Sequence, residues 1–552
     1  MISQRHSASN QDQPMFSRVL LIGLDGATFD VLGPLMERGV MPVLKSIVDG
    51  GSSGILESTK PPITPAAWTT FMTGKGPGRH GIIDFLRYDP TKNQLSFNNN
   101  QKISQKTIWQ ILSDKHHKVG SINVPMTFPP ESVNGFMISG FDTPPGEDFT
   151  YPKDLQTELL SRYPDYTHEK KWERKASGGD RLFARNLDYI SQSFERGYEL
   201  ARFCGNKYGW NVMMVLLKLV DNLQHKAWRY LDPRTRDKHP TRRDLTIDCL
   251  AKLDVALGDL KQFAEEHDAT ILIMSDHGHG SLDGKAQPNL LLARWGYLGL
   301  RSKLARAKTR GHVWWRRLTQ TRNGMPTAQL GSLDHDLAID WSQTQACVLH
   351  AGIYGFLYIN LKGRQPEDIA VVDPADFEAL RGEIREKLQA ATFKNRDGKV
   401  APIFPEVYTP EELYGCSRQD HPWMPDLLLA PAHGLAVVKK IRGRSPVRWV
   451  PLSRLEGTHR LEGVFAAHGP NIAAGNKVRA HIADLAPTIL AGLGERVPKD
   501  MDGHVLTDIF SRPVTVQYEP PQERKVEEEA PVLTEEQMEE VATRLSDLGY
   551  LD

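Results

Sequence analysis

Three aspartates in this chain stand at the ends of apolar runs. Asp25 ends "RVLLIGLD", Asp221 ends "WNVMMVLLKLVD" and Asp276 ends "ATILIMSD". In an open α/β sheet, ligands bind outside the carboxyl ends of the strands, so carboxylates from separate runs can converge there. Each aspartate taken alone could instead be the N-cap of the helix that follows its strand. The residues around the aspartates decide between a shared site and three unrelated caps.

Histidines accompany these carboxylates. His277 follows Asp276 directly in "SDHGHG", and His225 lies four positions after Asp221 in "DNLQH". Positions i and i+4 share one face of a helix, so this carboxylate and imidazole can bind the same ion. His459, in "GTHRLEGVFAAHGP" and just before a predicted strand, adds a third imidazole.

These aspartates and histidines form a donor set of oxygen and nitrogen without a thiolate. The set suits zinc, with manganese as the alternative, and it does not suit a structural zinc knuckle. Six protein ligands divide into two incomplete shells, each with open positions for a nucleophile and a substrate oxygen. We therefore expect two divalent ions.

The expected nucleophile lies in "STKPPITPAAWTTFMTGKGPGRHGI" (58–82). A short helix is predicted from Pro65 to Met72, with Thr64 at its N-cap. Backbone N–H groups and the helix dipole favour a phosphoryl group there, and a metal could lower the pKa of the hydroxyl. Threonine before proline is also a routine helix start, so a purely structural role stays open.

The elements that must position these residues follow an α/β pattern. Short apolar or β-branched runs alternate with longer helical patterns, which is typical of a largely parallel, buried sheet. The predicted strands are 18–25, 118–124, 210–221, 269–276, 356–361, 426–431 and 463–469. The main predicted helices are 31–50, 104–116, 181–203, 241–266 and 376–391.

Composition narrows the class of protein. In the 552 residues, Lys and Arg number 68, as do Asp and Glu, so net charge points neither to nucleic acid nor to an anionic membrane. The N-terminus lacks an apolar secretory segment, and no uninterrupted run of about 18 apolar residues occurs. The four cysteines lie far apart, without the spacing of a zinc site or a disulfide framework. We expect a soluble cytoplasmic protein with free thiols.

Two segments fall outside the α/β pattern. Residues 300–324 carry many Lys and Arg, no acidic residue, and the adjacent Trp314 and Trp315. They form either a basic lid that receives an anionic substrate or touches a phospholipid surface, or a solvated helical insert whose tryptophans pack on the body. Residues 514–532 are expected to be an extended linker, followed at 534–551 by an amphipathic helix. This tail should dock on the body or on a second copy of the chain, as a homo-oligomer.

In their order along the chain, the motifs resemble those of a known family. "LLIGLDG", "ITPAAWTTFMTGKGPGRHGI", "VDNLQH", "SDHGHG" and "GTHRLEGVFAAHGP" are similar to motifs of the metal-dependent phosphodiesterase and nucleotide pyrophosphatase branch of the alkaline phosphatase superfamily. The resemblance implies a three-layer α/β sandwich with a central, mostly parallel sheet, helices on both faces and cap-like insertions. It leads us to expect a disordered tail over 1–16, a catalytic domain over 17–511 with insertions at about 125–200 and 285–345, and the linker and helix over 512–552.

The resemblance also implies a role for each candidate residue. One ion would be held by Asp25, Thr64, Asp276 and His277, and the other by Asp221, His225 and His459. Thr64 would attack phosphorus in line and form a covalent phosphothreonine, which water hydrolyses from the opposite side. The implied substrate is an anionic phosphodiester or a nucleotide, and no specific nucleic acid is expected as a partner.

The segment after "HGI" departs from the family pattern. The nucleotide pyrophosphatases often carry an asparagine there that contacts a phosphoryl oxygen, whereas this chain has Asp84 and Phe85. A carboxylate near the phosphate disfavours a doubly charged monoester unless Lys75, Arg79 or Arg87 offsets its charge.

Three further histidines are left out of the ligand set. His80 and His279 could reach the site, but we expect each to pack or to support a ligand. His468, within a strand pattern, is expected to be structural.

Other functions of the same fold are the alternatives. They are a phosphomonoesterase, a sulfatase, and a transferase that passes a phosphoryl or phosphoalcohol group to an acceptor other than water. A sulfatase generates its nucleophile from Cys or Ser, which threonine cannot replace. A non-catalytic metal- or anion-binding protein is the last alternative, and the presence of every expected ligand argues against it.

Overall fold

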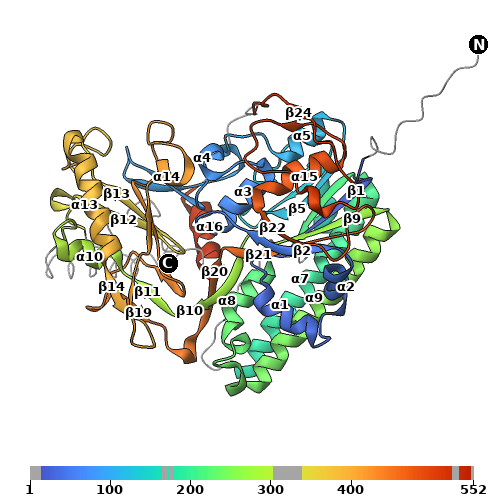
Figure 1. Cartoon of the computed structure of the whole chain (residues 1–552), viewed down its shortest axis with the longest axis horizontal. Coiled ribbons are helices and arrows are strands. Elements are labelled where there is room, and N and C mark those ends of the chain that lie inside the picture. The colour runs from blue at the N-terminus through green and yellow to red at the C-terminus, as the bar shows by residue number, and fades with distance from the viewer. Residues whose placement is uncertain are drawn as a thin grey trace, which may run out of the picture. The chain divides into compact units, whose positions relative to one another are not determined.

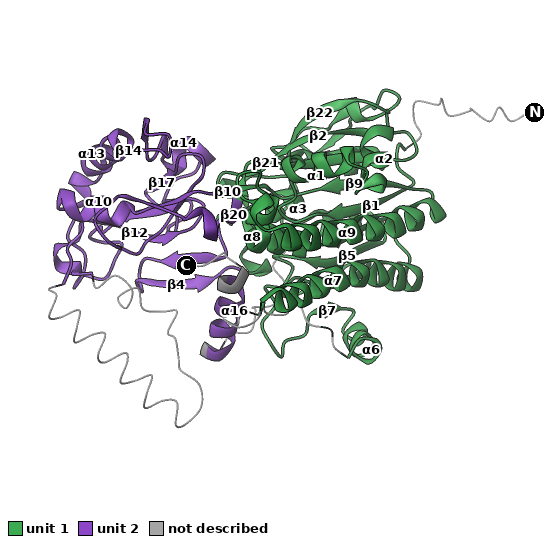
Figure 2. Ribbon diagram, turned by 90° about the horizontal axis from the view of Figure 1, so that it is seen from below, with its two compact units in different colours: residues 1–83, 99–280, 459–530 green, residues 84–98, 281–458, 531–552 purple. Residues whose placement is uncertain are grey.

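The structure is a computed structural model, and it describes residues 14–164, 166, 172–173, 179–301, 339–524 and 534–548. The chain forms two compact units (Figure 2). Unit 1 contains residues 1–83, 99–280 and 459–530, and unit 2 contains residues 84–98, 281–458 and 531–552. All the residues predicted to form the site belong to unit 1. Positions 302–324 of the basic segment, with both of its tryptophans, lie outside the described residues.

Unit 1 is built on a nine-stranded sheet in the order β22-β2-β21-β9-β1-β8-β5-β6-β7. β1 is parallel to both of its neighbours, β8 and β9, and its apolar sequence is buried. β21 and β7 run antiparallel to the strands beside them. The strands are β1 (Arg18–Gly23), β2 (Ser52–Glu57), β5 (Val119–Val124), β6 (Gly135–Ser139), β7 (Thr150–Tyr151), β8 (Val212–Leu216), β9 (Ala269–Met274), β21 (Glu462–His468) and β22 (Lys477–His481). The prediction of a mostly parallel central sheet is confirmed.

Helices cover both faces of this sheet (Figure 1). On one face, α7 packs against β5 and β8, α9 against β9, and α2 against β21. On the other face, α3 packs against α5 and α15. These helices are α2 (Pro42–Gly50), α3 (Thr64–Thr73), α5 (Ile108–Asp114), α7 (Gly179–Tyr208), α9 (Pro240–Glu266) and α15 (Leu485–Gly492). The expected three-layer α/β arrangement is therefore confirmed.

The long helix α7 shows why these segments fold as helices against the sheet. It buries Phe183, Leu187, Ile190 and Phe194, which recur at the spacing of one helical face. Burial of an apolar stripe of this kind supplies most of the stability of a helix in a protein.

The described part of unit 2 consists of small sheets and short helices. A four-stranded sheet has the order β12-β13-β17-β16, and a three-stranded sheet has the order β18-β11-β19. The strands expected at 356–361 and 426–431 are β13 and β17. The strands of these sheets are β11 (Gly284–Ala286), β12 (Ala346–Ala351), β13 (Gly355–Ile359), β16 (Glu406–Tyr408), β17 (Leu427–Ala430), β18 (Leu435–Val437) and β19 (Val447–Trp449). The helix expected at 376–391 is α13 (Phe377–Ala390).

Both ends of the described part of unit 1 are anchored by contacts. Met15 and Phe16 are buried, and their backbone N–H groups donate to the carbonyl of Gly492 at 2.7 and 2.8 Å. Residues 1–13 of the expected tail lie outside the described residues. Near the C-terminus, β24 (Tyr518–Glu519) pairs in parallel with β23 (Val497–Pro498) of unit 1.

An arginine whose side chain is largely covered follows β24. The guanidinium of Arg524 donates to the carbonyl of Asn100 at 3.0 Å and to Oε1 of Glu131 at 3.2 Å. The linker therefore docks on unit 1. The terminal helix α16 (Glu535–Leu548) belongs to unit 2. None of the helices within the described ranges is both long enough and apolar enough to cross a bilayer.

Candidate metal centre

The predicted ligands gather where the central strands of unit 1 end. β1 ends just before Asp25, and β9 ends just before Asp276. β8, the other neighbour of β1, is followed by α8 (Leu219–Leu231), which carries Asp221 and His225. Because the three strands are parallel, their carboxyl ends meet at one edge of the sheet.

Asp221 occupies a different place from the one that its apolar run predicts. β8 ends at Leu216, and Asp221 lies in the first turn of α8 rather than at the end of a strand. The chain turns at Leu217 and Lys218, which the continuous apolar pattern did not mark. Asp221 and His225 nevertheless share one helix face, as their spacing predicts.

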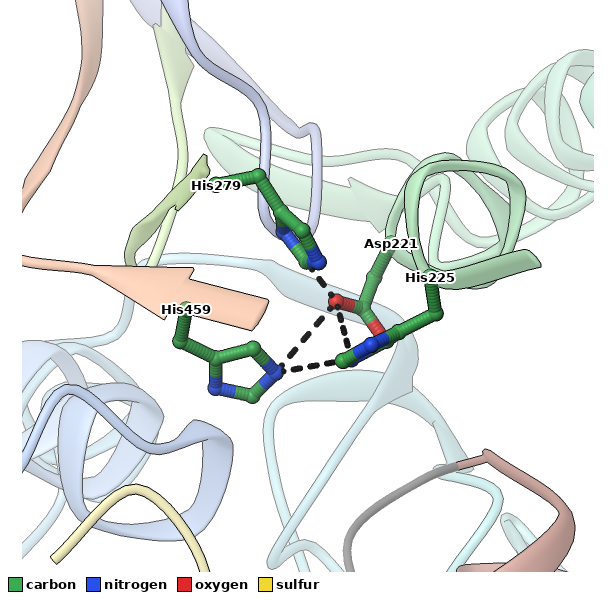
Figure 3. Close-up of side chains that lie close together, drawn as sticks. All are labelled: Asp221, His225, His279 and His459. Carbon is green, nitrogen blue, oxygen red and sulfur yellow. Dashed lines mark hydrogen bonds and ion pairs between the residues drawn. The ribbon is translucent and has the colours of Figure 1, made fainter. Parts of the chain in front are cut away.

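Four buried side chains form the first group of potential ligands: Asp221, His225, His279 and His459 (Figure 3). Nε2 of His225 lies 3.0 Å from Nε2 of His459 and 3.4 Å from Oδ1 of Asp221. The same oxygen of Asp221 lies 3.5 Å from Nε2 of His459 and 3.6 Å from Nδ1 of His279. One carboxylate oxygen therefore faces three imidazoles.

Asp25, Asp221 and His277 form a second group, so Asp221 belongs to both. Nε2 of His277 lies 3.9 Å from Oδ1 of Asp25 and 3.3 Å from Oδ2 of Asp276. The hydroxyl oxygen of Thr64 lies 3.4 Å from the same nitrogen. The structure thus brings every predicted site residue into or beside two adjoining groups.

Several oxygen and nitrogen atoms at this centre that could bind a metal are buried without a hydrogen-bond partner among the described residues. They are both carboxylate oxygens of Asp25, Oδ2 of Asp276 and Nε2 of His279. Leaving a buried polar group unsatisfied costs about 1–3 kcal/mol, and more for a charged group. A divalent cation offsets this cost, and carboxylate and imidazole are donors that zinc and manganese accept. The residues therefore fit a centre for divalent ions.

Burial and mutual repulsion shift the protonation of the carboxylates. Burial raises the pKa of Asp25 well above its usual range, and the charges of Asp276 and Asp221 raise it further, whereas Lys218 lowers it. Burial also raises the pKa of Asp276. The pKa of His459 lies well below its usual value, because the ring is buried and other imidazoles surround it. Burial therefore favours the neutral ring of His459, and a nearby positive charge favours the ionised forms of Asp25 and Asp276.

Backbone carbonyls orient two of the imidazoles. Nδ1 of His459 donates to the carbonyl of Pro62 at 3.0 Å, and Nδ1 of His277 donates to the carbonyl of Gly278 at 3.1 Å. A proton on Nδ1 leaves a lone pair on Nε2. In both residues Nε2 is the nitrogen that faces the carboxylates, so this tautomer is the one that metal binding requires.

Thr64 is the first residue of α3 and not its N-cap, which is Ile63. Pro65 then occupies the first turn, where a missing N–H costs nothing. The structure differs from the prediction by one position, because the extended conformation continues through Ile63. The buried hydroxyl of Thr64 still lies at the positive end of the helix dipole.

His279 is the residue that sequence reasoning left out and that the structure places in the first group. It lies on β10 (Gly278–Leu282), directly after His277 and Gly278. His277 lies in the bend just before β10, so a single glycine separates the two histidines. The alternation in "SDHGHG" was the signal that could have placed both histidines at the centre.

Two other residues considered from the sequence have partners of their own. Nε2 of His80 lies 2.9 Å from Oγ1 of Thr70, which is consistent with the packing role expected for His80. Asp84 belongs to unit 2, where its Oδ2 lies 2.8 Å from Nε2 of His350. An imidazole therefore partners the Asp84 carboxylate within its own unit.

Comparisons with known proteins extend these observations. The family described as type I phosphodiesterase / nucleotide pyrophosphatase matches residues 19–470. No curated protein matches the chain. Among solved structures, phosphonoacetate hydrolase from Sinorhizobium meliloti 1021, in complex with phosphonoformate, matches with a TM-score of 0.50 and 15% identity over 86% of this chain and 94% of that chain. Human ectonucleotide pyrophosphatase / phosphodiesterase 5 matches with a TM-score of 0.49 and 14% identity over 90% of this chain and 100% of that chain. The match to the bacterial hydrolase supports a shared fold.

Proposed function

Because the chain belongs to the type I phosphodiesterase / nucleotide pyrophosphatase family, in the alkaline phosphatase superfamily, we propose that it hydrolyses a phosphodiester or pyrophosphate bond with Thr64 as the nucleophile. One observation carries the proposal: two buried ligand groups share Asp221, and the hydroxyl of Thr64 lies beside one of them. A binding protein without catalysis would not need a hydroxyl at this place.

Each ligand group, completed by the side chains beside it, would hold one ion, and Asp221 would lie between the two ions. Asp221, His225 and His459 would hold the first, and Asp25, Thr64, Asp276 and His277 the second. Divalent ions bound there, zinc or manganese, would lower the pKa of the attacking hydroxyl and stabilise charge on the leaving oxygen. We propose zinc first, because imidazole and carboxylate in small shells suit it.

In the proposed reaction, Thr64 takes part in two steps. Oγ1 of Thr64 forms a bond to phosphorus while the bond to the leaving oxygen breaks on the opposite side. The leaving oxygen departs with the electron pair of its bond, and the proton that the hydroxyl loses balances the one that this oxygen takes up. The N-terminus of α3 favours the negative phosphoryl group that Thr64 then carries. Attack by water on phosphothreonine releases the phosphate product and restores the hydroxyl.

Positive charge near the carboxylates comes in part from Lys218. Lys218 is buried, and its Nζ lies 3.9 Å from the ring centroid of Phe141. Its charge lowers the pKa of Asp25. Lys218 therefore favours the ionised form of Asp25.

The test of this function uses the full chain, stripped with a chelator and reconstituted with zinc or manganese. Hydrolysis of bis(p-nitrophenyl) phosphate is compared with that of p-nitrophenyl phosphate and p-nitrophenyl sulfate. We expect the diester to have the highest kcat/KM, metal analysis to find two ions per chain, and the stripped protein to be inactive. Preference for the monoester or the sulfate would overturn the assigned reaction, and full activity after stripping would overturn the metal centre.

A further inference from the structure

The peptide of Gly26 connects the two ligand groups. Its N–H donates to Oδ1 of Asp276 at 3.0 Å. Its carbonyl oxygen accepts from Nε2 of Gln224 at 2.6 Å and lies 3.2 Å from Nδ1 of His279. Because Gly26 directly follows Asp25, a single peptide joins Asp25 and Asp276 to Gln224 on α8 and His279 on β10.

His279 provides a proton donor in this arrangement. A carbonyl oxygen only accepts hydrogen bonds, so the contact with Gly26 assigns the proton of His279 to Nδ1. The same nitrogen lies 3.6 Å from Oδ1 of Asp221, beyond hydrogen-bond length but close enough for its N–H dipole to attract the carboxylate. A protonated nitrogen cannot bind a cation, so this side of the ring orients Asp221.

The space around Gly26 is filled by the same side chains. Gly26 has a φ of +67°, and a Cβ built on it would lie 2.8 Å from Nδ1 of His279 and 2.9 Å from Oδ1 of Asp221. The His279 ring also stands at 83° to the ring of His225, with 4.6 Å between their centroids. His279 is therefore packed between the Gly26 peptide and residues of the first ligand group.

We infer that His279 is a positioning residue. It fixes the Asp221 carboxylate relative to the Gly26 peptide, and so links the geometry of one ion site to that of the other. The inference rests on the proposed two-metal function. Residues that orient metal ligands typically change metal affinity by about 10–100-fold when they are lost. Because Asp221 belongs to both groups, we expect loss of His279 to weaken the binding of both ions.

Two variants of similar size separate positioning from direct binding. The amide nitrogen of His279→Asn comes close to the place of Nδ1, whereas the amide of His279→Gln reaches the place of Nε2. Positioning through Nδ1 therefore predicts that asparagine preserves metal affinity and glutamine does not. A direct metal bond through Nε2 predicts the opposite order.

The control is a buried histidine of the same unit outside the ligand groups. His80, with its Thr70 partner, meets this requirement. The whole chain of the wild type, both His279 variants and His80→Ala is stripped of metal and titrated with Co²⁺ against a competing chelator. Visible absorption reports the coordination of each bound ion, and circular dichroism reports folding.

We expect His279→Gln to weaken both Co²⁺ sites by about 10–100-fold with an unchanged absorption per bound ion. His279→Asn and His80→Ala should keep affinities near the wild type. Equal affinities in all four proteins would overturn the inference, and so would a changed Co²⁺ spectrum in His279→Asn with normal binding by His279→Gln. A wild-type protein that binds no Co²⁺ would instead overturn the proposed function, so the two failures are distinguishable.

Discussion

Nε2 of His225 and Nε2 of His459 lie 3.0 Å apart, although 234 positions separate the two residues in the chain. Nδ1 of His459 donates to the carbonyl of Pro62, so Nε2 of His459 carries a lone pair. At this distance either Nε2 of His225 carries a proton and donates it to His459, or both nitrogens turn lone pairs toward a cation between them. Oδ1 of Asp221, at 3.4 and 3.5 Å from the two nitrogens, adds negative charge and favours the cation.

Replacing Thr64 with alanine should abolish turnover and leave the ions bound. The hydroxyl is one donor among several, so the remaining carboxylates and imidazoles still hold metal. Loss of a nucleophile typically lowers kcat by about 10³–10⁶-fold. Steady-state kinetics on bis(p-nitrophenyl) phosphate, together with metal analysis of the same preparation, measures both effects.

Thr69 provides the matched control for this change. It lies on the same helix, and its hydroxyl donates to the carbonyl of Pro65 at 2.6 Å. Thr69→Ala should keep the wild-type kcat, and Thr64→Ser should keep part of it. Wild-type turnover by Thr64→Ala would remove Thr64 from the role of nucleophile.

Asp221 and His225 should differ in how many ions depend on them. Asp221 belongs to both ligand groups, whereas His225 belongs to the first group alone. We expect Asp221→Asn to weaken both ions by at least about 10-fold, because it removes a shared negative charge. His225→Ala should release one ion and retain the other, as measured by metal analysis after dialysis. Retention of both ions by Asp221→Asn would contradict the shared role.

The backbone of Gly26 makes a further prediction. Gly26→Ala places a Cβ within 3 Å of both Asp221 and His279, at a φ that disfavours side chains. We expect it to weaken metal binding by about 10–100-fold, comparable to the loss of a residue that orients a ligand. Gly39→Ala is the control, because Gly39 has a φ of +73° with nothing within 4 Å. Gly39→Ala should lower stability slightly and leave metal affinity unchanged. Equal metal affinities in the two variants would mean that crowding at Gly26 is unimportant.

Local patterns in the sequence were sufficient to predict much of the centre. β1 is a buried apolar run, and its place before Asp25 follows from that run alone. The spacing of Asp221 and His225 predicts one helix face whether the helix starts before or after Asp221. These features depend on neighbours within a few positions, which a single sequence displays.

The rest depends on contacts between distant parts of the chain. His279 meets the carbonyl of Gly26 across 253 positions, and its tautomer follows from that contact. The shared role of Asp221 likewise depends on how α8 turns after β8, which the apolar run from 210 to 221 concealed. The partner of Asp84 is His350, and no spacing rule connects these two residues.

Replacing Asp25, a proposed metal ligand, with asparagine should stabilise the metal-free protein. Burial and the neighbouring carboxylates raise the pKa of Asp25 well above its model-peptide value of 3.8. Between that value and the raised pKa, the folded metal-free protein binds more protons than the unfolded chain, so its free energy of unfolding falls as the pH rises. The amide of an Asp25→Asn variant carries no charge at any of these pH values, so that variant should escape this loss.

At neutral pH, the metal-free Asp25→Asn protein should therefore exceed the metal-free wild type in stability by about 1–3 kcal/mol, the scale of a buried polar group without a partner. The advantage should shrink as the pH falls toward 4, because Asp25 then becomes neutral as well. The lowered pKa of His459 affects both proteins alike and cancels in the comparison. Urea unfolding in the presence of a chelator, at several pH values, measures the difference.

Asp248→Asn, at an exposed position on α9, is the control and should show no such trend. With metal restored the order should reverse, because an amide binds a divalent ion more weakly than a carboxylate. A metal-free Asp25→Asn protein less stable than the wild type at neutral pH would show that the Asp25 carboxylate is already satisfied without an ion.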